Sequence, residues 1–101
     1  MAAVTSVVNF RVKPGRYADL FEGIKTVKRS IERLGATILV NRQFVGPETG
    51  NVVAVARYPD WAAFAKAASD SELAGLIESM RNNPNPAWET IATAVYEEVV
   101  I

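Results

Sequence analysis

The order of the hydrophobic patterns along this chain constrains its fold most strongly. Apolar residues alternate with polar ones over Val4 to Val12, which predicts a strand with one more hydrophobic face. Apolar residues then recur at spacings of three and four over residues 17–34, which is typical of an amphipathic helix. Residues 36–45 and 51–58 predict two further strands, joined as a hairpin by the glycine- and proline-containing turn 46–50.

The second half of the chain repeats the helix-then-strand order. Asp60 is a suitable N-cap for a helix that carries Trp61 and Phe64, and residues 69–72 match a capping box that opens a further helical segment. A proline-rich loop ends this segment, and residues 88–101 predict a long last strand. The order β-α-β-β-α-β predicts an α+β, ferredoxin-like sandwich with a four-stranded antiparallel sheet, built as a single domain over residues 1–101.

One face of such a sheet is left without helices, and here it would carry many valine, isoleucine and alanine side chains. A second copy of the chain is the simplest cover for an apolar sheet face, so we expect a homodimer. The alternation of the first strand places Asn9 and Arg11 together on the face opposite Phe10.

The composition narrows the available chemistry. The chain has neither cysteine nor histidine, which excludes disulfides, iron–sulfur clusters, thiol nucleophiles and the commonest transition-metal ligands. We therefore predict no cofactor and no metal site. The N-terminal residues lack a basic segment followed by a long apolar run, and no apolar window is long enough to cross a bilayer, so a cytoplasmic location without membrane contact is expected.

Nucleic-acid binding is also not expected. Residues 1–45 hold eight lysine and arginine residues and three acidic ones, and residues 46–101 hold three basic and eight acidic residues. Much of the positive charge lies on one predicted helix, which is typical of a solvent-exposed helix face. The third predicted strand, residues 51–58, offers no aromatic run on which bases could stack.

Two segments carry a resemblance to a known group of proteins. Residues 10–16, Phe-Arg-Val-Lys-Pro-Gly-Arg, lead into the first helix, and residues 57–64, Arg-Tyr-Pro-Asp-Trp-Ala-Ala-Phe, join the third strand to the second helix. In these features the chain resembles the dimeric α/β barrel superfamily, which includes antibiotic-biosynthesis-type monooxygenases, heme-degrading monooxygenases and stress-responsive barrel proteins. The resemblance implies a ferredoxin-like fold that pairs into a dimeric α/β barrel.

The resemblance also allows a comparison with the heme-degrading members. These use an asparagine on the first strand, a tryptophan one turn after the phenylalanine of the second helix, and an axial histidine farther along. Asn9 lies near the first of these positions, but the other two fall near Ala67 and Ile77, so conventional heme ligation is not expected. Cofactor-free oxygenases of the superfamily, which oxidise electron-rich aromatic compounds, need fewer dedicated residues.

Five residues are candidates for ligand binding: Asn9, Arg11, Tyr58, Trp61 and Tyr96. Each has a structural alternative. Asn9 could bond a neighbouring backbone group, Arg11 could pair with Glu97 or Glu98, and the three aromatic residues could pack.

The leading hypothesis is a small-molecule-binding barrel protein, monooxygenase-like and independent of a cofactor, whose ligand is a small anionic or aromatic organic molecule. The alternative is a non-catalytic dimerisation or binding module with a filled barrel interior. A roomy cavity with converging polar side chains would favour the first hypothesis, and a filled interior the second.

Overall fold

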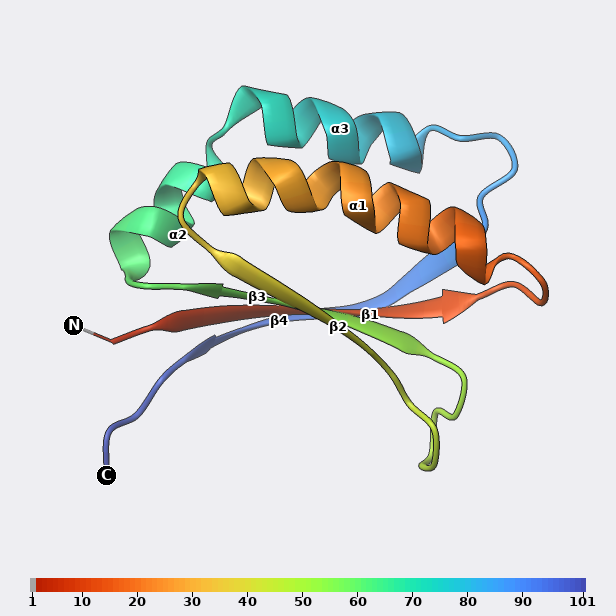
Figure 1. Cartoon of the computed structure of the whole chain (residues 1–101), viewed down its shortest axis with the longest axis horizontal. Helices are drawn as coiled ribbons and strands as arrows, with labels where there is room; N and C mark the ends of the chain where they lie inside the picture. The colour runs from red at the N-terminus through yellow and green to blue at the C-terminus, as the bar shows by residue number, and fades with distance from the viewer. Residues whose placement is uncertain (1) are drawn as a thin grey trace.

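A computed structural model describes residues 2–101 as one twisted sheet with three helices packed on a single face (Figure 1). All neighbouring strands are antiparallel, in the order β2-β3-β1-β4. The predicted α+β class and the βαββαβ order are confirmed, and β1 is a central strand. The elements are β1 (Val4–Val12), α1 (Tyr17–Arg33), β2 (Thr37–Arg42), β3 (Val52–Tyr58), α2 (Trp61–Ala68), α3 (Ser71–Arg81) and β4 (Trp88–Glu97).

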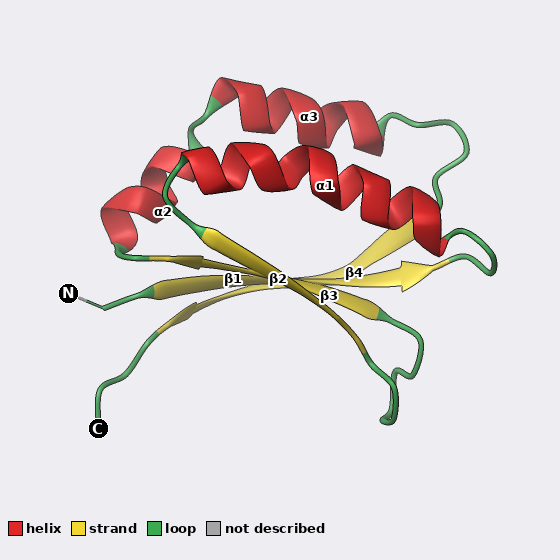
Figure 2. Cartoon of the chain, in the orientation of Figure 1, coloured by secondary structure: helices red, strands yellow, loops and turns green. Residues whose placement is uncertain are grey.

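Two strands are shorter than their hydrophobic patterns predict. β2 ends at Arg42 because Gln43 closes the following loop, where its side-chain oxygen accepts from the backbone N–H of Glu48 at 2.5 Å. β4 ends at Glu97, and a last backbone bond of 2.9 Å joins the N–H of Glu98 to the carbonyl of Ala3, where β1 begins. Both the β2–β3 loop and the C-terminal segment bend away from the helices (Figure 2).

The two short helices begin at aspartate caps. Asp60 accepts from the backbone N–H of Ala63 at 2.8 Å, as predicted. The predicted capping box at residues 69–72 is wrong, because Asp70 is the N-cap of α3 and accepts from the N–H of Leu73 at 2.9 Å. Ser69 instead ends α2, where its hydroxyl donates to the carbonyl of Ala65.

This assignment makes a prediction about acid stability. The hydrogen bond from Leu73, with the nearby Arg33, lowers the pKa of Asp70 in the folded protein. A carboxylate with a lowered folded pKa stabilises the fold above its unfolded pKa, and this contribution is lost as the pH falls through the folded pKa. Asp70→Ala should therefore lower the Tm at neutral pH and lose its effect in strong acid, in thermal scans followed by circular dichroism. Ser69→Ala is the control, and an equal, pH-independent loss in both variants would contradict the assignment.

The core lies between the helices and one face of the sheet, in two adjoining clusters. The first cluster of buried apolar side chains includes the fully buried Val4. The second cluster includes Leu20, which is also almost fully buried. Phe10 and Val12 pack against the second cluster. Because side chains alternate along a strand, the even-numbered residues of β1 face the helices and the odd-numbered ones face the open side of the sheet.

A bulge changes this alternation in β4. Asn9 pairs with Ala92 but Phe10 pairs with Thr90, so Ile91 is an extra residue without a partner in β1. The shift turns Trp88 toward the helices, where its ring meets Phe10 edge-on at 6.3 Å between centroids.

The bulged end of β4 also explains a glycine in α1. A Cβ atom on Gly23 would lie 3.1 Å from a ring carbon of Trp88 and 3.1 Å from the Sδ atom of Met80, so a larger residue would require these side chains to shift by a few tenths of an ångström. Across residues 2–101, no helix has both the length and the apolar character that a membrane crossing requires.

Candidate functional site

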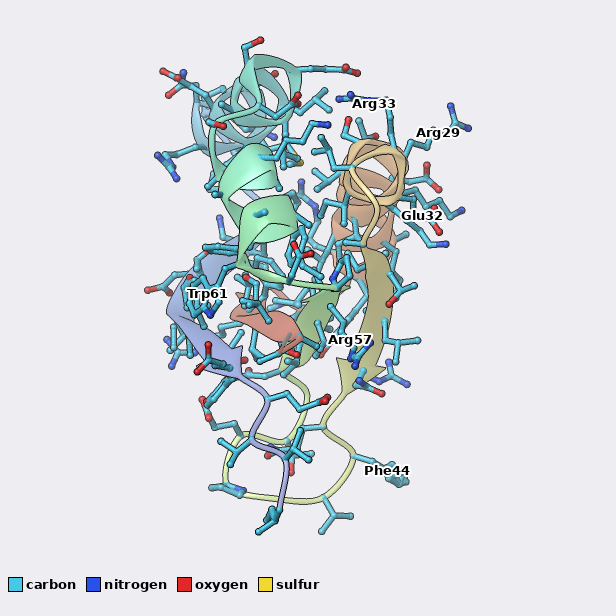
Figure 3. All side chains as sticks on the ribbon, turned by 90° about the vertical axis from the view of Figure 1, so that its left-hand side faces the viewer. Arg29, Glu32, Arg33, Phe44, Arg57 and Trp61 are labelled. Atoms are coloured by element: carbon cyan, nitrogen blue, oxygen red, sulfur yellow. The ribbon has the colours of Figure 1, made fainter. Side chains whose placement is uncertain are left out.

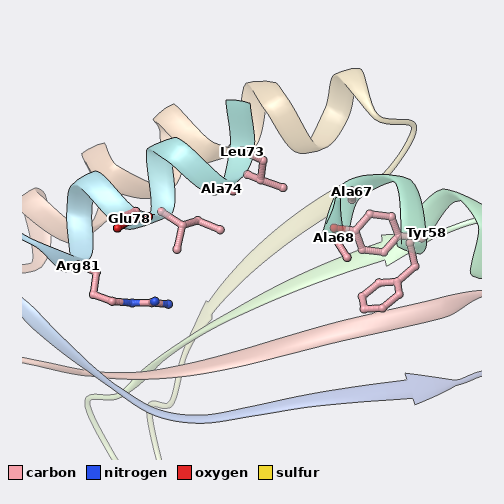
Figure 4. Close-up of a pocket in the computed structure, with 9 residues that line it drawn as sticks. Tyr58, Ala67, Ala68, Leu73, Ala74, Glu78 and Arg81 are labelled. Atoms are coloured by element: carbon pink, nitrogen blue, oxygen red, sulfur yellow. The ribbon is translucent and has the colours of Figure 1, made fainter. Parts of the chain in front are cut away.

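A groove of about 340 Å³ lies between α2 and α3, over the end of β3 (Figure 4). Pockets for small organic ligands measure about 300 to 1,000 Å³, so this groove is large enough for a compact molecule. It lies on the helix-covered side of the sheet. The residues that line it are Tyr58, Phe64, Ala67, Ala68, Leu73, Ala74, Ile77, Glu78 and Arg81.

Small side chains keep the groove open. Ala67 and Ala68 form its wall on α2, and Ala74 lies on α3 opposite them. Leu73 and Ile77 add apolar surface from α3. The sequence thus builds an apolar recess in which longer side chains at the alanine positions would occupy the space of a ligand.

Tyr58 contributes a polar group to the floor of the groove. It is the last residue of β3, it is 5% exposed, and its ring meets Phe64 edge-on at 5.5 Å between centroids. Burial raises the pKa of the Tyr58 hydroxyl, which therefore stays protonated at neutral pH and can donate a hydrogen bond. Tyr58 is absent from the side-chain hydrogen bonds formed within residues 2–101, so its hydroxyl is available to a ligand.

Glu78 and Arg81 add opposite charges at the other end of the groove. They are three residues apart on α3 and so lie on neighbouring positions of one helix face. The side chain of Arg81 extends from α3 toward the sheet (Figure 4). The ion pairs of the described chain are formed by other residues, so neither charge is neutralised by a salt bridge. The groove can therefore hold a planar apolar body beside a cation and a carboxylate.

Of the five ligand-binding candidates, only Tyr58 lines this groove. Asn9 and Arg11 lie on the opposite, open face of the sheet, as the alternation of β1 predicts. The predicted alternative pairing of Arg11 with Glu97 or Glu98 is wrong. The strand register places Arg11 opposite Glu89, and the two side chains form an exposed ion pair at 3.5 Å.

Asn9 belongs to a polar cluster on the open face that the sequence did not indicate. Its amide nitrogen lies 3.4 Å from a carboxylate oxygen of Glu48, whose other oxygen accepts from Asn51 at 3.1 Å. The side-chain oxygen of Asn9 is buried and has no hydrogen-bond partner in the part of the chain that the structure describes. Glu48 reaches this position through the β2–β3 loop, which strand alternation does not describe.

Trp61 and Tyr96 lie outside the groove. The indole N–H of Trp61 donates to the carboxylate of Glu97, and its ring meets Phe64 edge-on at 5.8 Å, so it supports a groove wall from behind. Tyr96 pairs with Thr5 on the open face and is 58% exposed. Figure 3 shows Trp61 on the β4 side of the molecule.

The two positions compared with the heme-degrading proteins, Ala67 and Ile77, both line the groove, whereas Asn9 is on the other face of the sheet. Neither groove position offers a metal ligand. Among residues 2–101, histidine, cysteine, aspartate and glutamate side chains form no group of three or more that could hold a metal ion.

Several solved structures share the fold of this chain. SnoaB, a cofactor-independent oxygenase from Streptomyces nogalater, is similar over 100% of this chain and 97% of its own, with a TM-score of 0.74 and 14% identity. A Deinococcus radiodurans protein, provisionally assigned as an antibiotic biosynthesis monooxygenase, has a TM-score of 0.74 and 13% identity over 97% of this chain and 94% of its own.

A third structure, an antibiotic biosynthesis monooxygenase, has a TM-score of 0.62 and 12% identity over 97% of this chain and 98% of its own. No family model and no curated protein sequence matches the chain. At these identities the likeness establishes the fold alone.

Proposed function

Because the chain has the fold of antibiotic-biosynthesis-monooxygenase-like proteins, we propose that its groove binds a small aromatic molecule with an anionic or phenolic oxygen and oxygenates it without a cofactor. One observation carries the proposal: Tyr58, which bears a neutral hydroxyl, and Arg81, which bears a cation, line a single mostly apolar groove of ligand size. A cation and a neutral donor together favour an oxygen that gains negative charge.

The reaction needs few protein groups. An electron-rich aromatic anion can pass electrons to molecular oxygen itself, and the protein contributes binding, orientation and stabilisation of charge. For a dihydroxynaphthalene, reaction with one O₂ gives a hydroxynaphthoquinone and one water. One oxygen atom becomes a carbonyl oxygen on a ring carbon, and the other leaves in the water. The oxygenase activity of SnoaB supports this reaction class for the shared fold.

We further propose that the open face of the sheet pairs with a second copy of the chain. All three helices lie on the opposite face (Figure 1), and the open face carries Val7, Val53 and Val55 beside the 68%-exposed Leu39. The groove lies on the helix side, so a filled interface between two sheets leaves it accessible. A filled barrel interior therefore does not by itself favour a non-catalytic module.

The binding proposal predicts the behaviour of two variants. Arg81→Gln removes the charge that faces the groove and should weaken naphthoate binding about ten- to hundredfold, the usual cost of a charge-assisted hydrogen bond. Tyr58→Phe keeps the ring contact with Phe64 and should weaken binding by a smaller factor. Isothermal titration calorimetry measures both.

Arg29→Gln is the matched control for charge. Arg29 is an exposed arginine of α1, lies outside the groove and takes no part in the ion pairs of the described chain. Its replacement should leave naphthoate affinity unchanged. If Arg81→Gln and Arg29→Gln bind naphthoate equally well, the groove is not the anion site.

A further inference from the structure

We infer that Glu78 is the general base of the groove, the group that takes the proton from the phenolic oxygen of the bound substrate. This inference rests on the proposed function and adds a catalytic residue to it. Oxidation by molecular oxygen proceeds from the electron-rich anion, so a neutral phenol must first lose its proton. Removal of that proton by a positioned side chain accelerates such a step by about 10² to 10⁴-fold.

The composition of the groove leads to Glu78. Six of the nine lining residues are alanine, leucine, isoleucine or phenylalanine and cannot accept a proton. Tyr58 is protonated at neutral pH because burial raises its pKa, and Arg81 is always a cation. Glu78 is therefore the one lining side chain that can act as a base, in a chain without histidine or cysteine.

The surroundings of Glu78 leave its carboxylate free for this role. It forms no ion pair within residues 2–101, although Arg81 lies one turn farther along α3. On the neighbouring α1, Arg33 forms ion pairs with Asp70 and Glu72 at the start of α3. On α2, Lys66 is exposed and does not line the groove. Tyr58 of β3 and Arg81 of α3 are the other titratable groups that line the groove.

The proton balance then closes within the site. The phenol gives its proton to the Glu78 carboxylate, and Arg81 stabilises the phenolate. Addition of O₂ to a ring carbon gives a peroxide anion, which takes the proton back from Glu78 as a hydroperoxide. Loss of the ring hydrogen as a proton to Glu78, with cleavage of the O–O bond, releases hydroxide, and the same proton converts this hydroxide to water.

Glu78→Gln tests this role because it keeps the size and polarity of the side chain and removes the base. The readout is kcat/KM for oxygen uptake with a dihydroxynaphthalene, measured over the pH units below the ordinary pKa of a phenol, about 10. The wild-type value should change little over this range, because the base removes the proton from the bound phenol. The variant should be about 10² to 10⁴-fold slower at the acidic end and gain about tenfold per pH unit, because it depends on phenolate formed in solution.

Two controls separate this inference from the proposed function. Glu72→Gln removes a carboxylate of the same helix that lies outside the groove, and it should keep the wild-type profile. Naphthoate should bind Glu78→Gln at least as tightly as the wild type, which shows that the groove is intact. A Glu78→Gln variant with wild-type rates and pH profile overturns the role of Glu78 alone, whereas a wild-type protein that binds no naphthoate and consumes no oxygen overturns both.

Discussion

A Val7→Asp variant is expected to sediment as a monomer at micromolar concentrations where the wild type sediments as a dimer. Val7 lies at the centre of the open face, between Val55 of β3 and Ala94 of β4. A symmetric pair of sheets would bury two unpaired carboxylates at this position, each at a cost of several kcal/mol. A loss of about 4 kcal/mol weakens the dimer roughly a thousandfold.

The control for this variant places the same charge elsewhere. Ala65 is exposed on α2, so Ala65→Asp should leave the dimer intact. Far-ultraviolet circular dichroism distinguishes a folded Val7→Asp monomer from an unfolded chain. A folded Val7→Asp protein that remains dimeric would show that the two copies meet through another surface, and a monomeric wild type would overturn the pairing itself.

An Ala74→Trp variant is expected to lose naphthoate binding by at least a hundredfold, on the order of 3 kcal/mol. Ala74 is exposed on α3 and lines the groove, so an indole ring there can occupy the space of the ligand without displacing the core. Affinity is measured by calorimetry and the Tm by circular dichroism. The Tm should change little, because no buried side chain is replaced.

Ala65→Trp is the matched substitution on α2, outside the groove, and should bind naphthoate like the wild type. If Ala74→Trp retained full affinity with an unchanged Tm, the ligand would bind at another place. The polar cluster of Asn9 and Glu48 on the open face would then be the first region to test, since it contains a buried unpartnered oxygen.

Much of the fold follows from the sequence because the local patterns agree with the global arrangement. The bounds of β1 and the cap at Asp60 are as predicted, since strand alternation and capping are properties of neighbouring residues. The predictions for residues 36–45 and 88–101 were too long for a non-local reason. A strand extends only as far as its partners do, and the backbone pairing of β4 stops where β1 begins at Val4.

The candidate site was predicted less completely, for a similar reason. Alternation placed Asn9 and Arg11 correctly on one face, but the groove is formed by three elements that meet only in the folded chain. Arg81 and Glu78 look like ordinary residues of a helix end in the sequence. Only the meeting of α2, α3 and the end of β3 around one groove gives their charges a common neighbour in Tyr58.

The extra residue at Ile91 gives β4 two halves of opposite parity. From Ala92 to Glu97, the even-numbered residues of β4 face the open side of the sheet. Between Trp88 and Thr90, it is the odd-numbered Glu89 that faces the open side. Deletion of Ile91 would therefore leave an unbroken alternation, with Ala92 still opposite Asn9 and Thr90 still opposite Phe10, so both halves would keep their faces. A one-residue deletion elsewhere in β4 would instead turn the side chains on one side of the deletion to the other face of the sheet.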